Sequence, residues 1–78
     1  MTEKDIIREA IKARNINQTI LAQMCGFKTQ SVISQRLRGT SMSVQNFVEL
    51  LDAMGFDVQV RDRNSSNKDN RWTVTKAD

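Results

Sequence analysis

The spacing of hydrophobic positions predicts four helices followed by two strands. In four successive stretches up to residue 56, apolar residues recur at the three- and four-residue intervals of an amphipathic helix. In residues 56–61 and again in residues 71–76, apolar and polar positions alternate, as they do in a half-buried strand. Asn and Ser dominate residues 64–70, which predicts a loop between the strands. The expected fold is mostly α: a compact bundle of four or five helices followed by a C-terminal β-hairpin.

The ends of the predicted helices are marked by residues that commonly cap helices. Thr2 and Asn17 precede the first two apolar stripes, and Ser43 precedes the fourth. Gly26 follows the second stripe, where a residue with a left-handed backbone often ends a helix. Thr29 is then expected to cap the third helix. These residues predict two short helices, over residues 17–26 and 29–39, joined by a short turn.

This pair of short helices resembles the helix-turn-helix of the lambda-repressor-like (Cro-type) family. The resemblance lies in Asn17-Gln18-x-x-Leu21-Ala22-x-x-x-Gly26, Thr29-Gln30-Ser31-x-Ile33-Ser34 and Leu37-x-Gly39. It covers about residues 3–56, and it implies that the second helix enters the DNA major groove while the first lies across the backbone. Members of the family are mostly phage repressors, bacterial regulators and antitoxins. We therefore expect a DNA-binding domain at residues 1–56 and an appended β-hairpin at residues 57–78.

The polar side of the third predicted helix is expected to contact DNA bases. Glutamine can pair bidentately with adenine and arginine with guanine, whereas serine can hydrogen-bond to either base. The positions that match the usual base readers of the family are Gln30, Ser31, Ser34 and Gln35. The alternative interpretation of this helix side is a polar, solvated surface.

Phosphate contacts position a protein on DNA without reading its sequence. We expect them from the polar and cationic residues around the helix pair, which are Gln18, Lys28, Thr29, Arg36, Arg38, Ser41 and Ser43. For Gln18 the expectation comes from the family, whose members commonly contact the backbone at this position. Helix capping alone would explain the two serines that precede the fourth helix.

The distribution of charge supports a polyanionic partner. The net charge of +3 is modest and by itself would not indicate nucleic acid. However, no acidic residue lies between Glu9 and Glu49, and this interval holds Lys12, Arg14, Lys28, Arg36 and Arg38. An uninterrupted positive field around the third helix suits binding to double-stranded DNA. The alternative is chance clustering of cations on a solvated surface.

The predicted hairpin places Val58, Val60, Trp72 and Val74 on one face. Two strands alone are marginally stable in water, so this face needs a surface to pack on. We expect a second copy of the chain to provide this surface, because the single core of a 78-residue domain gives only a small margin of stability that a partner chain often supplements. The alternative is a hairpin that folds back on its own helices.

Other classes of function have little support in the sequence. The chain has no histidine, and Cys25, its one cysteine, is interpreted as a small buried hydrophobe, so no metal, disulfide or other cofactor is expected. No nucleophile–base pair or glycine-rich phosphate loop is present, so we expect neither an enzyme nor a small-molecule substrate. No apolar run approaches the roughly 18 residues of a membrane span, and the polar start is no signal peptide. The expected location is therefore the cytoplasm, without membrane contact.

The sequence thus predicts a sequence-specific, double-stranded-DNA-binding transcriptional regulator of the repressor type. One helix-turn-helix reads only a few base pairs, so we expect a homodimer on a palindromic operator. The second hypothesis is a protein-interaction module of the same fold, such as an antitoxin or an anti-repressor. Such a module would bind its partner protein through the hairpin edge and Trp72.

Overall fold

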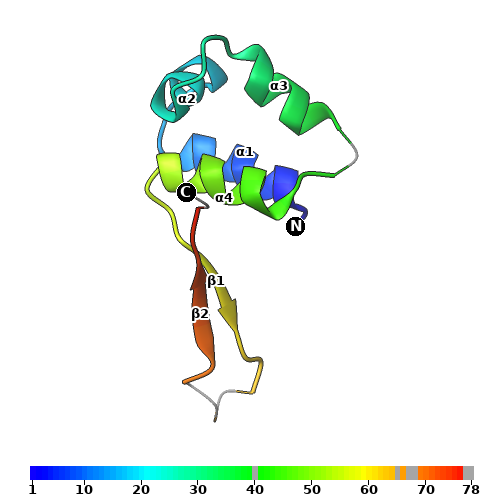
Figure 1. The fold of residues 1–78 in the computed structure, drawn as a ribbon, viewed down its shortest axis with the longest axis vertical. Helices are drawn as coiled ribbons and strands as arrows, with labels where there is room; N and C mark the ends of the chain where they lie inside the picture. The colour runs from blue at the N-terminus through cyan, green and yellow to red at the C-terminus, as the bar shows by residue number, and fades with distance from the viewer. Residues whose placement is uncertain (40, 65, 67–68, 77–78) are drawn as a thin grey trace.

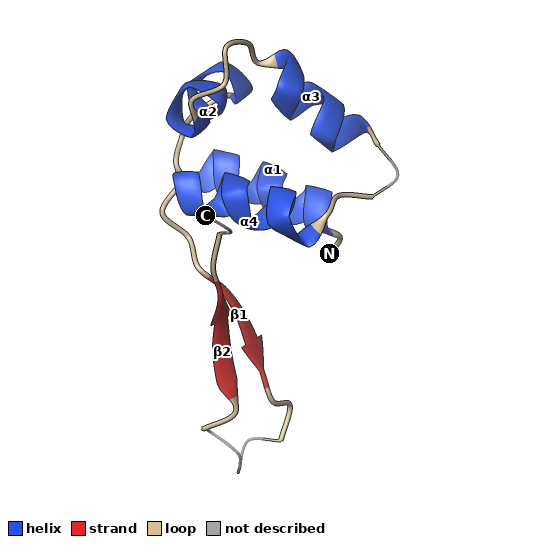
Figure 2. Ribbon diagram, in the orientation of Figure 1, coloured by secondary structure: helices blue, strands red, loops and turns tan. Residues whose placement is uncertain are grey.

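The computed structural model describes residues 1–39, 41–64, 66 and 69–76. These residues form the helices and strands α1 (Glu3–Ala13), α2 (Gln18–Cys25), α3 (Ser31–Arg38), α4 (Val44–Ala53), β1 (Val58–Arg61) and β2 (Arg71–Val74). Figure 1 shows α1 and α4 side by side, with α2 and α3 on one side of them and the hairpin leaving on the other. The mostly helical fold with a C-terminal hairpin is confirmed, with four helices among the described residues (Figure 2).

Three of the predicted caps are confirmed. The Thr2 side chain forms a reciprocal capping box at the start of α1. The Asn17 carboxamide oxygen accepts a hydrogen bond of 2.8 Å from a backbone N–H in the first turn of α2. The Ser43 hydroxyl does the same for α4 at 3.1 Å. Gly26 ends α2 with a backbone φ of 79°, a left-handed conformation that glycine adopts without strain.

The cap predicted at Thr29 is wrong. Helix α3 begins at Ser31, and its N-cap residue is Gln30, which makes no side-chain capping bond. The Thr29 hydroxyl instead lies 2.6 Å from the Ser31 hydroxyl and hydrogen-bonds to it. The N-cap is therefore displaced by one residue, from Thr29 to Gln30, and the backbone angles of Gln30, −74° and −9°, are already in the helical region.

The core lies between the four helices and fixes their relative positions. Each helix contributes one side chain with no exposed surface, namely Ile7, Leu21, Ile33 and Leu50. Cys25 packs against this cluster but is only partly buried, so its interpretation as a small buried hydrophobe is confirmed in part. Burial raises the pKa of the Cys25 thiol, and the Glu49 carboxylate adds to the rise. The thiol is therefore neutral near pH 7 and a poor nucleophile.

Four apolar residues of the predicted stripes are exposed, namely Ile6, Ile20, Met24 and Val44. Val44 is 63% exposed because it is the first residue of α4, where the core cluster does not reach. Ile6 is 37% exposed, whereas Ile7 beside it is fully buried. The apolar stripe of α1 is therefore wider than the surface that the other helices cover.

The hairpin has the predicted register and projects from the bundle. Val58 lies opposite Val74, and Val60 lies opposite Trp72, so the four side chains share one face. Val58 packs against the edge of the core. Val60 and Trp72, however, are 52% and 61% exposed. The hairpin therefore does not fold back on its own helices, and that alternative is wrong (Figure 1).

Candidate nucleic-acid interface

Helix α3 is anchored by its apolar side, which leaves its polar side open. Ile33 is fully buried and Leu37 is 4% exposed, so these two side chains hold α3 against the core. Gln30, Ser31 and Gln35 are exposed. Three of the four predicted base readers therefore lie on the open side of α3. Their amide and hydroxyl groups can donate hydrogen bonds to base edges and accept them.

The fourth predicted base reader, Ser34, lies half-buried between α2 and α3. Its hydroxyl lies 2.8 Å from the Gln18 side-chain oxygen and 3.0 Å from the Gln30 side-chain oxygen. A hydroxyl carries one hydrogen, so the two carboxamides share it as acceptors. Ser34 therefore ties two candidate DNA contacts together across the helix pair. A carboxamide oxygen that accepts one such bond has a second lone pair, and its NH2 group can still donate.

Exposed residues with donor groups flank α3 at both ends. Lys28 and Thr29 lie in the turn before the helix, and Arg38 is its last residue. The Arg38 Nε atom lies 3.4 Å from the Ser34 carbonyl oxygen, one turn back along the helix. These positions suit contacts with phosphates on either side of a groove that α3 enters.

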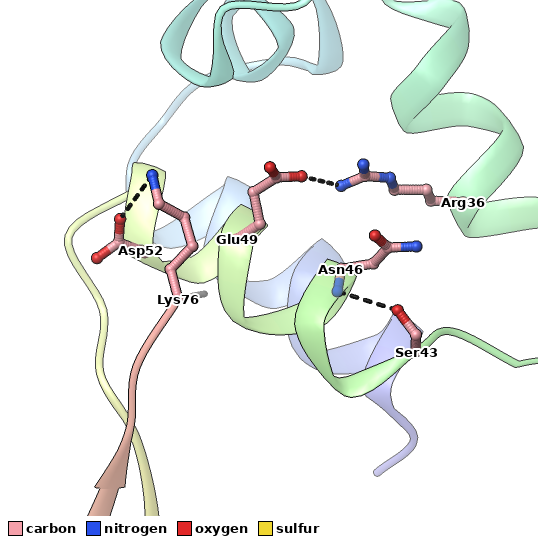
Figure 3. A network of polar contacts seen from close by, with 6 residues as sticks. All are labelled: Arg36, Ser43, Asn46, Glu49, Asp52 and Lys76. Atoms are coloured by element: carbon pink, nitrogen blue, oxygen red, sulfur yellow. Dashed lines mark hydrogen bonds and ion pairs between the residues drawn. The ribbon is translucent and has the colours of Figure 1, made fainter. Parts of the chain in front are cut away.

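Arg36 points into the protein and not toward solvent. Its Nη1 atom lies 2.7 Å from Glu49 Oε1, and its side chain is only 18% exposed (Figure 3). Its guanidinium also lies 4.8 Å from the centroid of the Phe27 ring. The positive charge of a guanidinium that contacts a carboxylate and an aromatic face is already balanced within the protein. We therefore assign Arg36 to holding α3 against α4 and leave it outside the DNA contacts that we propose.

The two serines before α4 differ in their engagement. The Ser43 hydroxyl accepts the capping bond from the Asn46 backbone N–H, as Figure 3 shows, and still has its hydrogen to donate. Ser41 is exposed. A phosphate contact from either residue stays a prediction.

The structure supplies little for other kinds of site. Within residues 1–39, 41–64, 66 and 69–76, no three His, Cys, Asp or Glu side chains are grouped so that they would hold a metal ion. None of the four described helices has the length and apolar character needed to cross a bilayer.

The bundle and the open polar side of α3 define a class of protein, the helix-turn-helix DNA-binding regulators. Residues 7–60 match the family model described as Helix-turn-helix, a stretch that runs from α1 into β1. The chain belongs to this family, in its lambda repressor and Cro type. No curated protein and no solved structure matches the chain significantly.

The two arginines of α3, replaced one at a time, should affect different properties: Arg36 the stability of the fold, and Arg38 the affinity for DNA. Arg36→Met removes the bond to Glu49 and the ring contact, so the free energy of unfolding should fall by about 1–3 kcal/mol. Arg38→Met removes an exposed cation, so stability should change by less than about 0.5 kcal/mol. For Arg38→Met, the slope of log DNA affinity against log salt concentration should flatten by about one unit. Urea denaturation and binding at several salt concentrations measure both quantities.

In Arg36→Met the salt slope should match that of the unmodified chain. A flattened slope with unchanged stability would instead place Arg36 at a phosphate and contradict its assignment to the α3–α4 contact.

Proposed function

We propose that this chain is a sequence-specific transcriptional regulator of the repressor type, from a phage or a bacterium, that acts in the cytoplasm. Membership of the helix-turn-helix family supports binding to double-stranded DNA. The observation that carries the finer proposal is the exposed start of α3, where Gln30 and Ser31 face solvent and Ser34 holds the Gln30 side chain. A convex helix with oriented amides is the form in which base edges are read directly.

In the proposed complex, α3 enters the major groove with its N-terminal end and α2 crosses the backbone. Gln30, Ser31 and Gln35 contact base edges, and Ser34 acts through Gln30 and Gln18. The remaining contacts are made to phosphates by Gln18, Lys28, Thr29, Arg38, Ser41 and Ser43. Phosphate contacts fix the register of the protein, and base contacts select the sequence.

We further propose that two copies bind together. A homodimer about a two-fold axis doubles the few base pairs that one α3 reads. It also requires a palindromic site whose half-sites lie about 34 Å apart, or a multiple of that distance. The apolar face of the hairpin, made by Val58, Val60, Trp72 and Val74, is the proposed contact between the copies, and Val60 and Trp72 are its exposed members.

A salt titration tests the DNA-binding proposal. Affinity for a selected duplex should fall steeply with salt and should exceed affinity for random duplex by about 10³-fold or more. In Lys28→Ala the slope should flatten by about one unit on both duplexes, because one phosphate contact is lost. Lys76→Ala is the matched control, since Lys76 pairs with Asp52 at 4.0 Å on the hairpin side of the bundle. Equal effects of the two substitutions would contradict the placement of DNA at α3.

A second candidate function is a protein-interaction module, such as an antitoxin or an anti-repressor. The observation in its favour is the exposure of Trp72, at 61% of its surface, on a projecting hairpin. Exposed aromatic side chains of this kind are common anchors in protein interfaces. A flat salt response, together with equal affinity for selected and random duplexes, would favour this function over DNA reading.

A further inference from the structure

An apolar hollow of about 350 Å³ opens beside the root of the hairpin. Helix α1 contributes Ile6 and Ala10 to its lining, α4 contributes Leu51, and the link to β1 contributes Phe56. Two acids, Glu9 and Asp57, also line the hollow, as does Met1, and Glu9 lies 3.7 Å from the Lys12 ammonium. This hollow explains why Ile6 is exposed although it belongs to the apolar stripe of α1.

One wall of the hollow is fixed in place. The Arg14 guanidinium lies 4.1 Å from the centroid of the Phe56 ring. Its Nε atom also donates a hydrogen bond of 2.8 Å to the Met54 carbonyl oxygen at the end of α4. Arg14 therefore holds the Phe56 ring beside the end of α4. A ligand would find this wall already formed, which lowers the entropic cost of binding.

The same chain carries a protrusion whose chemistry matches the hollow. Val60 and Trp72 face each other across the strands and expose about half of their surface or more, 52% and 61%. The adjacent pair in the register is Arg61 opposite Arg71, and both are exposed. Two like charges placed directly opposite each other are unfavourable. The protrusion thus combines apolar side chains with two arginines, and the lining of the hollow combines apolar side chains with two acids.

Trp72 does not line the hollow of its own chain. Its partner Val60 lies three residues after Asp57, which is about 10 Å along an extended strand. The hairpin also runs away from the helices, as Figure 1 shows. In a second copy, related by a two-fold axis between Trp72 and the hollow, each Trp72 would meet the hollow of the other copy. A self-complementary patch of this kind gives a closed, symmetric dimer.

We propose that Trp72 of each copy inserts into the hollow between α1, α4 and Phe56 of the other copy, with Arg61 and Arg71 beside Glu9 and Asp57. The inference rests on the homodimer proposed above and names its contact. It is independent of whether α3 reads DNA, because the residues that line the hollow do not come from α3 and the hairpin leaves the α1–α4 layer on the side away from α3 (Figure 1). Trp and Arg are the residue types most often found at the energetic centre of interfaces.

The fluorescence of Trp72 tests this contact in the full chain. Trp72 is the only tryptophan and there is no tyrosine, so the emission reports the surroundings of this one side chain. We expect the emission maximum to move to shorter wavelength over the same concentration range in which sedimentation shows dimer formation. Emission typical of water-exposed tryptophan in the dimer would overturn the proposal.

Two substitutions, one on each side of the contact, complete the test. Trp72→Ser and Ile6→Lys should each raise the dimer dissociation constant at least about 30-fold, the loss typical of a central interface residue. Val44→Lys is the matched control, because Val44 is equally apolar and 63% exposed but lies at the start of α4, away from the hollow. Circular dichroism should show the same helix content in all three variants, since each replaced side chain is exposed.

The outcomes separate this contact from the wider proposal. Dimer loss in Trp72→Ser with no change in Ile6→Lys would mean that the hairpins pair with each other, which overturns the hollow as the docking site. A charge exchange gives a second criterion: Glu9→Arg should weaken the dimer, and adding Arg71→Glu should restore it. A chain that is monomeric at all concentrations would refute the homodimer itself. Base preference that depends on Gln30 would still be measurable on a half-site.

Discussion

Replacement of Leu50 by alanine should remove most of the stability of the fold. Leu50 has no exposed surface and belongs to the cluster that joins all four helices. Truncation of a buried leucine to alanine costs about 2–5 kcal/mol, because the cavity it leaves does not close fully. A domain of this length has a total stability of only about 4–12 kcal/mol. Urea denaturation followed by helical circular dichroism should therefore show a transition at much lower urea, or no folded baseline.

Val44→Ala is the control for this prediction. Val44 belongs to the same helix but is 63% exposed, so its truncation should change stability by less than about 0.5 kcal/mol. Equal transitions for Leu50→Ala and Val44→Ala would show that the four helices are not held together by one shared core.

Replacement of Gln30 by alanine should relax the base preference of the protein. Gln30 is exposed at the start of α3, where a bidentate bond to adenine is possible. Loss of such a pair costs about 1–3 kcal/mol of discrimination at one position of the site. Competition between duplexes that carry each of the four bases at each position measures this loss. Equal loss of affinity for selected and random DNA would mean that Gln30 contacts the backbone and not a base.

Two further variants sharpen the result for Gln30. Gln59→Ala on β1 removes the same side chain from an exposed position of the hairpin and should leave base preference unchanged. Ser34→Ala should relax the preference at the same base position as Gln30→Ala, because Ser34 holds the Gln30 carboxamide at 3.0 Å. The double variant should lose less than the sum of the single losses, as expected for residues in one hydrogen-bonded network.

The parts of the fold that depend on local sequence were predictable. The helices follow from apolar spacing, and three helix starts follow from the caps Thr2, Asn17 and Ser43. The hairpin register follows from alternation, which places Val60 opposite Trp72. In each case the deciding interactions join residues that are close in sequence or belong to one regular pattern.

The features that depend on packing between helices were not predictable in the same way. Arg36 appears in the sequence as a cation of the third helix, and its pairing with Glu49 depends on how α3 crosses α4. Ser34 appears as a base reader, yet its link to Gln18 exists only because α2 and α3 meet there. The hollow beside Ile6 depends on how much of α1 the other helices leave uncovered. Glu49 lies 13 residues after Arg36, and this separation does not correspond to the spacing of neighbours within one helix or one strand, so the sequence pattern does not predict that the two residues pair.

The direction of the hairpin also depends on the assembled bundle. Alternation places the apolar side chains on one face, but it does not say whether that face meets the helices. In the structure Val58 reaches the core edge, while Val60 and Trp72 lie beyond it and stay exposed. Strand β1 leaves the core between Val58 and Val60. The outer part of the apolar face, made by Val60 and Trp72, is therefore accessible to a second copy.

Selection of binding sites from a pool of random DNA duplexes tests most directly whether α3 reads base sequence. We expect the unmodified chain to enrich one motif with two inverted half-sites, whose centres lie about 34 Å or a multiple of it apart. The Gln30→Ala variant should enrich the same motif with the preference lost at one position of each half-site. No enrichment by the unmodified chain, or an identical motif from the variant, would contradict the assignment of base reading to the start of α3.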